Sequence, residues 1–208
     1  MRILLALSAI LVAAACERTD RADRPADTIP PAPPAGGSFS PPESAAIGNR
    51  TCEVNGVPIL TGDGIGAIRP GRTVDELKQL CEVVSDAQQR GVEGAMERVM
   101  VIRVAGEDVP ATVVDDKVWR IAISSPRFRT SDSLGVDTPL RRIAAKQGAQ
   151  FAPGEDGVYG FVPDHCGLSF RFSLPLRPPA GGQWTAASIG TAHADAAVNR
   201  VLVTRCAR

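Results

Sequence analysis

Residue types that carry out chemistry lie close together in the second half of the chain. His165 directly precedes Cys166, and a neighbouring histidine can activate a cysteine thiolate. Adjacent strand residues point to opposite faces, so we do not expect these two side chains to act together. His193 and Asp195 could ligate a metal with His165, but the chain has only 2 histidines and no short Cys/His cluster. We therefore predict no metal site and no cofactor.

Two other motif-like stretches are explained more simply as turns. Residues 62–66 (GDGIG) resemble a phosphate-binding loop, but the lysine and the serine or threonine of such a loop do not follow. We expect a glycine-rich approach to a helix there. Asp115 and Asp116 are predicted to form a turn rather than a calcium site. Without a Gly-x-Ser-x-Gly elbow or a Ser-His-Asp arrangement, we predict that no residue is catalytic and that the protein is not an enzyme.

A repeated strand pattern carries two arginines at matching positions. The segment VWRIAIS at residues 118–124 reappears as VNRVLVT at residues 198–204, with β-branched residues at alternate positions. Arg120 and Arg200 are third in each copy. They could form a shared anion site, although such arginines more commonly face solvent or pair with an acid on the next strand.

A short amphipathic helix is predicted before each copy of this strand. Thr73 and Glu76 have the spacing of a capping box, with Val74, Leu77 and Leu80 on one face. For the second helix, we expect Thr138 as the N-cap, Pro139 at the first helical position, apolar Leu140, Ile143 and Ala144, and Gly148 as the C-cap.

The strands are predicted to form antiparallel meanders because their connections are too short for parallel crossovers. The first covers residues 98–105, 109–114 and 117–124, and the second covers 158–162 and 167–173, where Leu168, Phe170 and Phe172 share a face. Residues 174–197 are predicted to be a long irregular insertion. The fold class is therefore α+β, with two pseudo-equivalent units, 50–130 and 131–208, each a short helix packed on an antiparallel meander.

The N-terminal 49 residues are predicted to export and tether this domain. Residues 1–15 combine a basic start, an apolar stretch and three alanines, which is typical of a secretory signal. Cys16 follows as in a lipobox, where it would be acylated, for example with palmitate, although Ala13 replaces the usual leucine and ordinary cleavage after Ala15 stays open. Residues 16–49 are proline-rich and are predicted to be a disordered tether, with a proline-rich docking ligand as the alternative.

The four remaining cysteines form an even set, as expected for disulfides in an oxidising compartment. They are Cys52, Cys81, Cys166 and Cys206. If each unit closes on itself, Cys52 pairs with Cys81 and Cys166 with Cys206, which is one of three possible pairings.

A resemblance follows from the Gly-x-Thr turn that leads into a short helix, the antiparallel meander after it, and their repetition with disulfides and a lipobox. This pattern resembles the tandem helix-plus-sheet units of β-lactamase inhibitor protein. A single unit is also similar to the small outer-membrane lipoproteins of the SmpA/OmlA type. The resemblance implies a protein-binding module with no catalytic residues to carry over.

The composition limits the classes of partner. The chain has 208 residues, with 23 basic and 23 acidic side chains, so we predict no nucleic-acid binding through bulk charge. We expect a lipoprotein of the bacterial cell envelope that faces the periplasm, contacts the membrane through its lipid and binds another envelope protein. Alternatives are an inhibitor of an exported hydrolase and a periplasmic domain that binds a small ligand. The predicted interface is Trp184 with Arg177 and Gln183, unless Trp184 covers the core as a lid.

Overall fold

A computed structural model of the chain describes residues 52, 56–91, 94–178 and 182–206. All of these residues fall within one unit of the chain. The predicted signal peptide at 1–15, the predicted lipidation site Cys16 and the predicted tether at 16–49 lie outside the described residues. Within the described ranges, no helix has the length and apolar character that crossing a bilayer requires.

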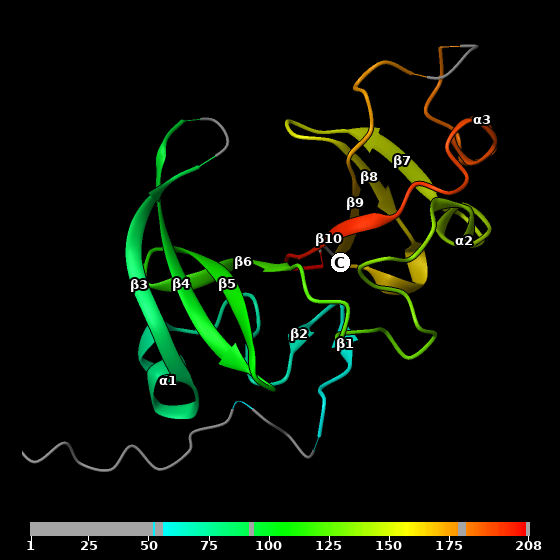
Figure 1. Cartoon of the computed structure of the whole chain (residues 1–208). Coiled ribbons are helices and arrows are strands. Elements are labelled where there is room, and N and C mark those ends of the chain that lie inside the picture. Colours follow the sequence, from blue (N-terminus) through cyan, green and yellow to red (C-terminus); the bar gives the residue numbers. More distant parts are fainter. Residues whose placement is uncertain (1–51, 53–55, 92–93, 179–181, 207–208) are drawn as a thin grey trace, which may run out of the picture. The chain divides into compact units, whose positions relative to one another are not determined.

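The main sheet has eight antiparallel strands in the order β3-β4-β5-β6-β10-β9-β8-β7 (Figure 1). This confirms the predicted α+β class with antiparallel strands. Residues 50–130 supply the first four strands and residues 131–208 the other four, and β6 and β10 meet at the centre. The strands are β3 (Glu82–Arg90), β4 (Met96–Val104), β5 (Glu107–Val114), β6 (Lys117–Ile123), β7 (Gln150–Pro153), β8 (Val158–Phe161), β9 (Leu168–Phe172) and β10 (Val198–Val203).

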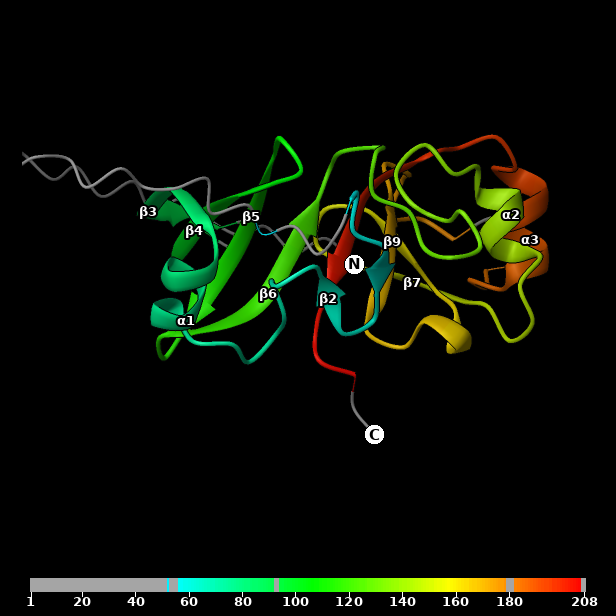
Figure 2. The same ribbon diagram turned by 90° about the horizontal axis from the view of Figure 1, so that it is seen from below.

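Short helices and a small hairpin complete the described part of the fold. The helices are α1 (Val74–Leu80), α2 (Leu140–Ala144), α3 (Ala186–Ala192) and the 3-10 turn η1 (Pro163–His165). Helix α1 contacts β3, whereas α2 contacts β8 and lies beside α3 (Figures 1 and 2). The hairpin of β1 (Leu60–Thr61) and β2 (Gly64–Ile65) falls in the glycine-rich stretch, which therefore turns the chain back on itself.

One face of the sheet is apolar and buried because alternate strand residues point to the same side. The predicted shared face of Leu168, Phe170 and Phe172 is confirmed, since all three side chains are buried. The strands β4, β6 and β10 contribute further members of the same core, namely Met100, Ile102, Val104, Val118, Ile121, Ile123, Val198, Val201 and Val203. The intervening residues of the central strands are left on the opposite face, which we call the open face.

Helix α1 begins as its sequence predicts. The Thr73 hydroxyl accepts a hydrogen bond from the Glu76 backbone, and the Glu76 carboxylate accepts one from the Thr73 backbone N–H at 2.9 Å. This reciprocal capping box satisfies two backbone donors that the first helical turn leaves free. Val74 and Leu77 are buried, but Leu80, predicted to share their face, is exposed because the helix ends there.

Helix α2 differs from its prediction at both ends. Pro139 rather than Thr138 occupies the N-cap position, and the Thr138 hydroxyl instead accepts a hydrogen bond from the Gly135 N–H at 2.9 Å. The Thr138 carbonyl accepts from the Val198 N–H, so this residue is held against the start of β10. The helix ends at Ala144, four residues before the predicted C-cap Gly148, which lies with positive φ in the following turn.

Helix α2 packs tightly on β8 because β8 carries a glycine at the contact. A Cβ at Gly160 would lie 3.1 Å from Cγ2 of Ile143 and 3.0 Å from Cε1 of Phe151. Both neighbours are buried core side chains that could not move away without leaving space elsewhere. The absence of a side chain at Gly160 therefore lets the helix approach the strand.

The prediction that residues 174–197 are irregular is wrong in part, because α3 forms within them. The Thr185 hydroxyl caps this helix by accepting from the Ser188 N–H at 3.1 Å, and Ile189 is buried. The pattern AASIGTA has a single strongly apolar residue, so it carries no helical periodicity that could reveal it. The outer strands β3 and β7 were also not predicted.

Candidate functional site

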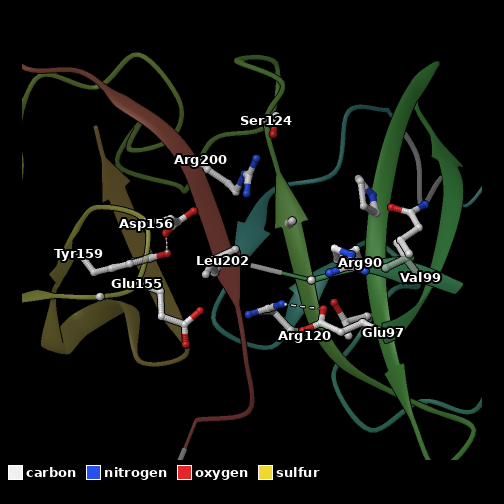
Figure 3. Close-up of a pocket in the computed structure, with 16 residues that line it drawn as sticks. Arg90, Glu97, Val99, Arg120, Ser124, Glu155, Asp156, Tyr159, Arg200 and Leu202 are labelled. Atoms are coloured by element: carbon white, nitrogen blue, oxygen red, sulfur yellow. Dashed lines mark hydrogen bonds and ion pairs between the residues drawn. The ribbon is translucent and has the colours of Figure 1, made fainter. Parts of the chain in front are cut away.

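A concave region lies on the open face, across the centre of the sheet. It is a groove of about 470 Å³, which we call the central groove (Figure 3). Side chains from both halves of the sheet form it, so it depends on the pairing of β6 with β10. Its lining residues are Gln89, Arg90, Gly91, Glu97, Val99, Pro110, Thr112, Arg120, Ala122, Ser124, Gly154, Glu155, Asp156, Tyr159, Arg200 and Leu202.

The register of the two central strands fixes the floor of the groove. Ala122 of β6 lies opposite Leu202 of β10. Arg120 is two residues before Ala122 and Arg200 is two residues before Leu202. Because the strands are antiparallel, the arginines lie on the same face but on opposite sides of the Ala122–Leu202 pair, as Figure 3 shows. The sequence analysis singled out this arginine pair, and the structure brings both side chains to one groove.

The two arginines differ in their surroundings. Nη2 of Arg120 lies 3.2 Å from Oε2 of Glu97 on β4, and Cζ of Arg120 lies 4.9 Å from the centroid of the Trp119 ring. None of the ion pairs within the described part of the chain includes Arg200. Arg120 therefore pairs with an acid across the sheet, although this acid lies on β4 and not on a strand adjacent to β6, whereas Arg200 presents its charge to the groove.

One wall of the groove is a charged cluster that is held in place by mutual contacts. The Tyr159 hydroxyl donates a hydrogen bond to Oδ1 of Asp156 at 2.5 Å, and Nε of Arg171 lies 2.9 Å from Oδ2 of the same carboxylate. The Tyr159 ring lies against Gly154, where a Cβ would come within 2.4 Å of Cε2. The Tyr159 side chain thus contacts both Gly154 and the Asp156 carboxylate.

The same cluster changes the pKa values of its members. Burial opposes the ionisation of Asp156, but the Tyr159 hydrogen bond and the Arg171 and Arg200 charges outweigh it and lower the pKa of the carboxyl. Burial raises the pKa of the Tyr159 hydroxyl, and the hydrogen bond to the Asp156 carboxylate raises it further. At neutral pH the wall therefore carries an ionised Asp156 and a neutral tyrosine that donates to it.

Another, smaller hollow lies near the ends of β3, β4, β5 and β6. It has a volume of about 280 Å³, and three large apolar residues exposed to solvent lie around it. Met96 is 61% exposed, Trp119 52% and Val114 50%. We call these three residues the Trp119 patch. Exposed aromatic and methionine side chains that lie together are typical of protein interfaces.

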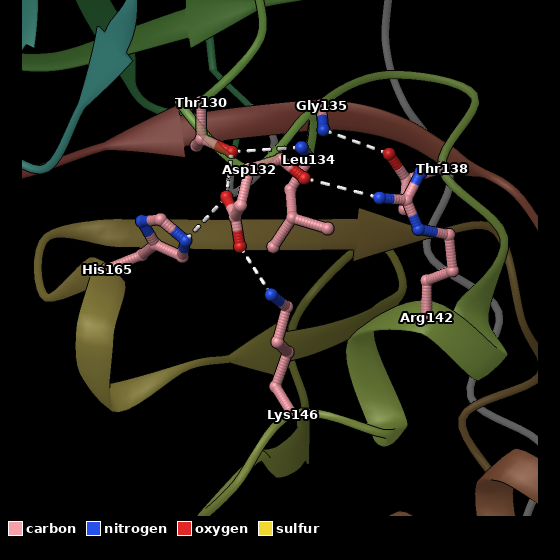
Figure 4. A network of polar contacts seen from close by, with 8 residues as sticks. All are labelled: Thr130, Asp132, Leu134, Gly135, Thr138, Arg142, Lys146 and His165. Carbon is pink, nitrogen blue, oxygen red and sulfur yellow. Dashed lines mark hydrogen bonds and ion pairs between the residues drawn. The ribbon is translucent and has the colours of Figure 1, made fainter.

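The histidine, cysteine and aspartate residues that the sequence suggested as candidates for chemistry have structural contacts instead. Cys166 forms a disulfide with Cys206, so it has no thiolate for His165 to activate. Nε2 of His165 instead lies 3.0 Å from Oδ1 of Asp132, a carboxylate that also pairs with Lys146 and accepts from the Thr130 hydroxyl at 2.5 Å (Figure 4). Asp132 thus links the loop before α2, the end of that helix and η1.

His193 and Asp195 also have local roles. His193 is the C-cap of α3, and Asp195 forms an ion pair with Arg141 of α2. Among residues 52, 56–91, 94–178 and 182–206, no group of three histidine, cysteine, aspartate or glutamate side chains is arranged to hold a metal ion.

The disulfides follow the pairing in which each half closes on itself. Cys52 is bonded to Cys81, and Cys166 is bonded to Cys206. The first bridge fastens the chain ahead of β1 to the start of β3, and the second fastens the start of β9 to the chain after β10. Disulfides form and persist outside the reducing cytosol, so the two bridges fit an extracytoplasmic domain.

The predicted interface residues do not form part of the central groove. Trp184 is half-buried and packs against the core, as expected if it acts as a lid. Arg177 and Gln183 are exposed, and the Gln183 carbonyl accepts a hydrogen bond from the Ser188 hydroxyl in the first turn of α3. The central groove lies elsewhere, where β6 and β10 join the two halves of the sheet.

Four residues at or beside the groove were not predicted from the sequence, namely Glu97, Asp156, Tyr159 and Arg171. They come from four strands or hairpins, and their contacts span up to 23 residues of sequence. Asp156 and Tyr159 are only three residues apart, but this spacing by itself does not indicate a site. The pairing of β8 with β9 places Tyr159 opposite Arg171, and the pairing of β6 with β10 brings this cluster to the same groove as Glu97.

Comparisons with known proteins identify no family for the chain. No family model matches it, and no curated protein matches its sequence. A solved structure that it is similar to is that of the uncharacterized protein YfeY from Escherichia coli, with 16% identity, a TM-score of 0.49, and coverage of 71% of this chain and 99% of that chain. No family model supports the resemblance to β-lactamase inhibitor protein or to SmpA/OmlA-type lipoproteins.

Proposed function

We propose that this protein is a lipid-anchored, non-enzymatic protein of the bacterial cell envelope, which binds another envelope protein in its central groove. The proposal rests mainly on the shape and the lining of this groove. The groove is open along the sheet, its floor has an apolar centre at Ala122 and Leu202 with an arginine on either side, its walls carry charged side chains, and its lining comes from both halves of the fold. Apolar centres with charged and aromatic surroundings are typical of protein interfaces.

The contacts among the lining residues favour binding over catalysis. The Glu97 carboxylate pairs with Arg120, and the Asp156 carboxylate pairs with Arg171 and Tyr159. A general base or nucleophile needs a free lone pair directed at a substrate, whereas these carboxylates are directed at neighbouring cations. Their arrangement holds the walls in one shape, which suits recognition of a partner surface.

The two halves are proposed to be pseudo-equivalent units related by a two-fold axis at the centre of the sheet. Each residue of 118–124 corresponds to the residue 80 positions later in 198–204, because 198 minus 118 is 80. With that offset, Ile121 corresponds to Val201 and Ile123 to Val203, and the observed pairs are Ile121 with Val203 and Ile123 with Val201. The register is therefore symmetric about Ala122 and Leu202, which puts the groove on the proposed axis.

The proposed location rests on the N-terminal sequence together with the disulfides. Residues 1–15 read as a secretory signal and Cys16 as a lipidation site. Acyl chains on Cys16 would hold the domain at a membrane, and the proline-rich residues 17–49 would let it reach a partner. Mass spectrometry of the protein from its native cells should find an acylated N-terminus at Cys16. An unmodified Cys16 in the soluble periplasmic fraction would overturn this part of the proposal.

Site-specific photocrosslinking tests the proposed binding. A photoreactive amino acid at Leu202, on the groove floor, should form one defined protein adduct in native cells. The same group at Arg141, exposed on α2, should not form that adduct. The captured protein is then purified, and its binding to the full chain is measured directly. An adduct at Arg141 with none at Leu202 would refute the groove, and an exported hydrolase as the captured protein would select the inhibitor alternative.

A further inference from the structure

The spacing of charges along the central groove has a simple geometric form. Arg120, the Ala122–Leu202 pair and Arg200 follow one another along the strand direction, and successive positions are two residues apart. The arginines are thus four residues apart along the strands, or about 13 Å at about 3.3 Å per residue. Figure 3 shows Leu202 between the two guanidinium groups.

An extended peptide has the same spacing on one of its faces. Residues i, i+2 and i+4 of an extended chain point to one side, and the outer two are about 13 Å apart. A segment that runs along β6 and β10 could place one apolar side chain over Ala122 and Leu202 and one charged side chain at each arginine. The register of the floor therefore selects a sequence pattern in the occupant.

The charges along the floor of the groove determine which sign of charge the bound segment should carry. Both floor charges are arginines, and no ion pair within the described ranges includes Arg200 or Arg90, on the opposite wall. The acid Asp156 is already paired with Arg171, and Glu97 with Arg120. An anionic segment would meet Arg200 and Arg90, which form no ion pair within the described ranges, and would share Arg120 with Glu97. A cationic segment would have to compete with resident arginines for Asp156 and Glu97, and Glu155, the third acid of the lining, is not free either.

We propose that the central groove binds an extended acidic segment of a partner protein, with the pattern acid-x-apolar-x-acid. This rests on the proposed function only in placing a protein in the groove. The outer carboxylates pair with Arg120 and Arg200, and the apolar side chain lies on Ala122 and Leu202. Glu97 already occupies Arg120, so it acts as an internal competitor for one of the two carboxylates.

The test uses three capped heptapeptides with the full-length protein in detergent. The probe SESVSES has the proposed pattern, SKSVSKS reverses its charge, and SEESVSS keeps its composition but moves one glutamate out of register. Amide chemical shifts are followed by NMR at millimolar peptide. The probe should give saturable shifts at Ala122, Arg200 and Leu202. We expect SESVSES to bind about tenfold more tightly than SEESVSS, because SEESVSS loses one charge-assisted contact. The lysine peptide SKSVSKS should give no saturation.

Three variants make the test specific. Arg200→Gln should weaken binding of the probe about tenfold, because one charge-assisted contact is lost. Glu97→Gln should tighten it several-fold, because the competing carboxylate is removed from Arg120. Arg141→Gln removes an arginine of α2 outside the groove and should leave the affinity unchanged. The gain with Glu97→Gln cannot come from a folding defect, so it separates recognition from loss of structure.

Equal binding of the three peptides, shifts outside the groove, or no saturable shifts would overturn the inference. Weaker binding by Glu97→Gln would also contradict it. These failures are distinct from failure of the proposed function. If a partner crosslinks at Leu202 but the probe SESVSES does not displace it, the groove is an interface whose occupant is not an acidic segment. If nothing crosslinks there, the proposed function fails independently of the peptide result.

Discussion

A single carboxylate, that of Asp132, joins three segments in the second half of the fold. Burial opposes its ionisation, but hydrogen bonds from Lys146, Thr130 and His165 outweigh it and hold the pKa of the carboxyl well below its usual value. A group with a pKa lowered by folding stabilises the native state above its unfolded pKa of about 4 and loses that contribution as the pH falls.

Replacement of Asp132 should therefore destabilise the protein in a pH-dependent way. Asp132→Asn is expected to lower the free energy of unfolding by about 1–2 kcal/mol at pH 7, with allowance for solvent screening of a partly exposed site. The difference from wild type should shrink as the pH falls below about 4. Urea unfolding across this range measures it. Asp195→Asn, in an exposed ion pair, is the control, and equal losses in both variants would contradict the account.

At the scale of elements, α3 contributes one fully buried side chain to the core. Ile189 is fully buried, and Trp184 just before the helix packs against the same core. Ile189→Ala should lower the free energy of unfolding by about 2–4 kcal/mol through lost burial and a residual cavity. Leu176→Ala, at an exposed position in the same connection, should change it little. If Ile189→Ala kept its stability but lost partner binding, residues 174–197 would be an interface instead.

The elements that the sequence predicted are those with a local signal. The capping box of Thr73 and Glu76 and the alternation of Leu168, Phe170 and Phe172 are both contained within a few residues, and both are present in the structure. The strand β3 was missed because almost all of its side chains are exposed, so EVVSDAQQR has no apolar alternation. Its pairing with β4 defines it instead.

The site was less predictable than the elements because it is made by strand pairing. Arg120 and Arg200 were recognised as equivalent from a repeated pattern, but the same pattern could not show that β6 and β10 pair with each other. When β6 and β10 pair, the two arginines lie on one face, and Tyr159 and Glu97 line the same groove. Long-range register is a tertiary property that periodicity within a segment does not contain.

At the scale of the whole molecule, one disulfide fastens each half of the sheet. The bridges join cysteines 29 and 40 residues apart, and loop entropy depends only weakly on length. Each pair of Cys→Ala substitutions should therefore lower the free energy of unfolding by about 2–4 kcal/mol, with less than about 1 kcal/mol between the two variants. Denaturant unfolding of both double variants tests this, and a bridge that could be removed without loss would contradict it.

The central claim is that the groove between the two halves binds a partner protein. Its most direct measurement is the dissociation constant of the purified crosslinked partner for the wild-type chain and for Leu202→Arg, which places a bulky charge on the floor. We expect Leu202→Arg to bind the partner at least about tenfold more weakly than wild type, with a melting temperature close to that of wild type. Arg141→Gln on α2 should leave the dissociation constant unchanged. Wild-type affinity in a folded Leu202→Arg variant would contradict it.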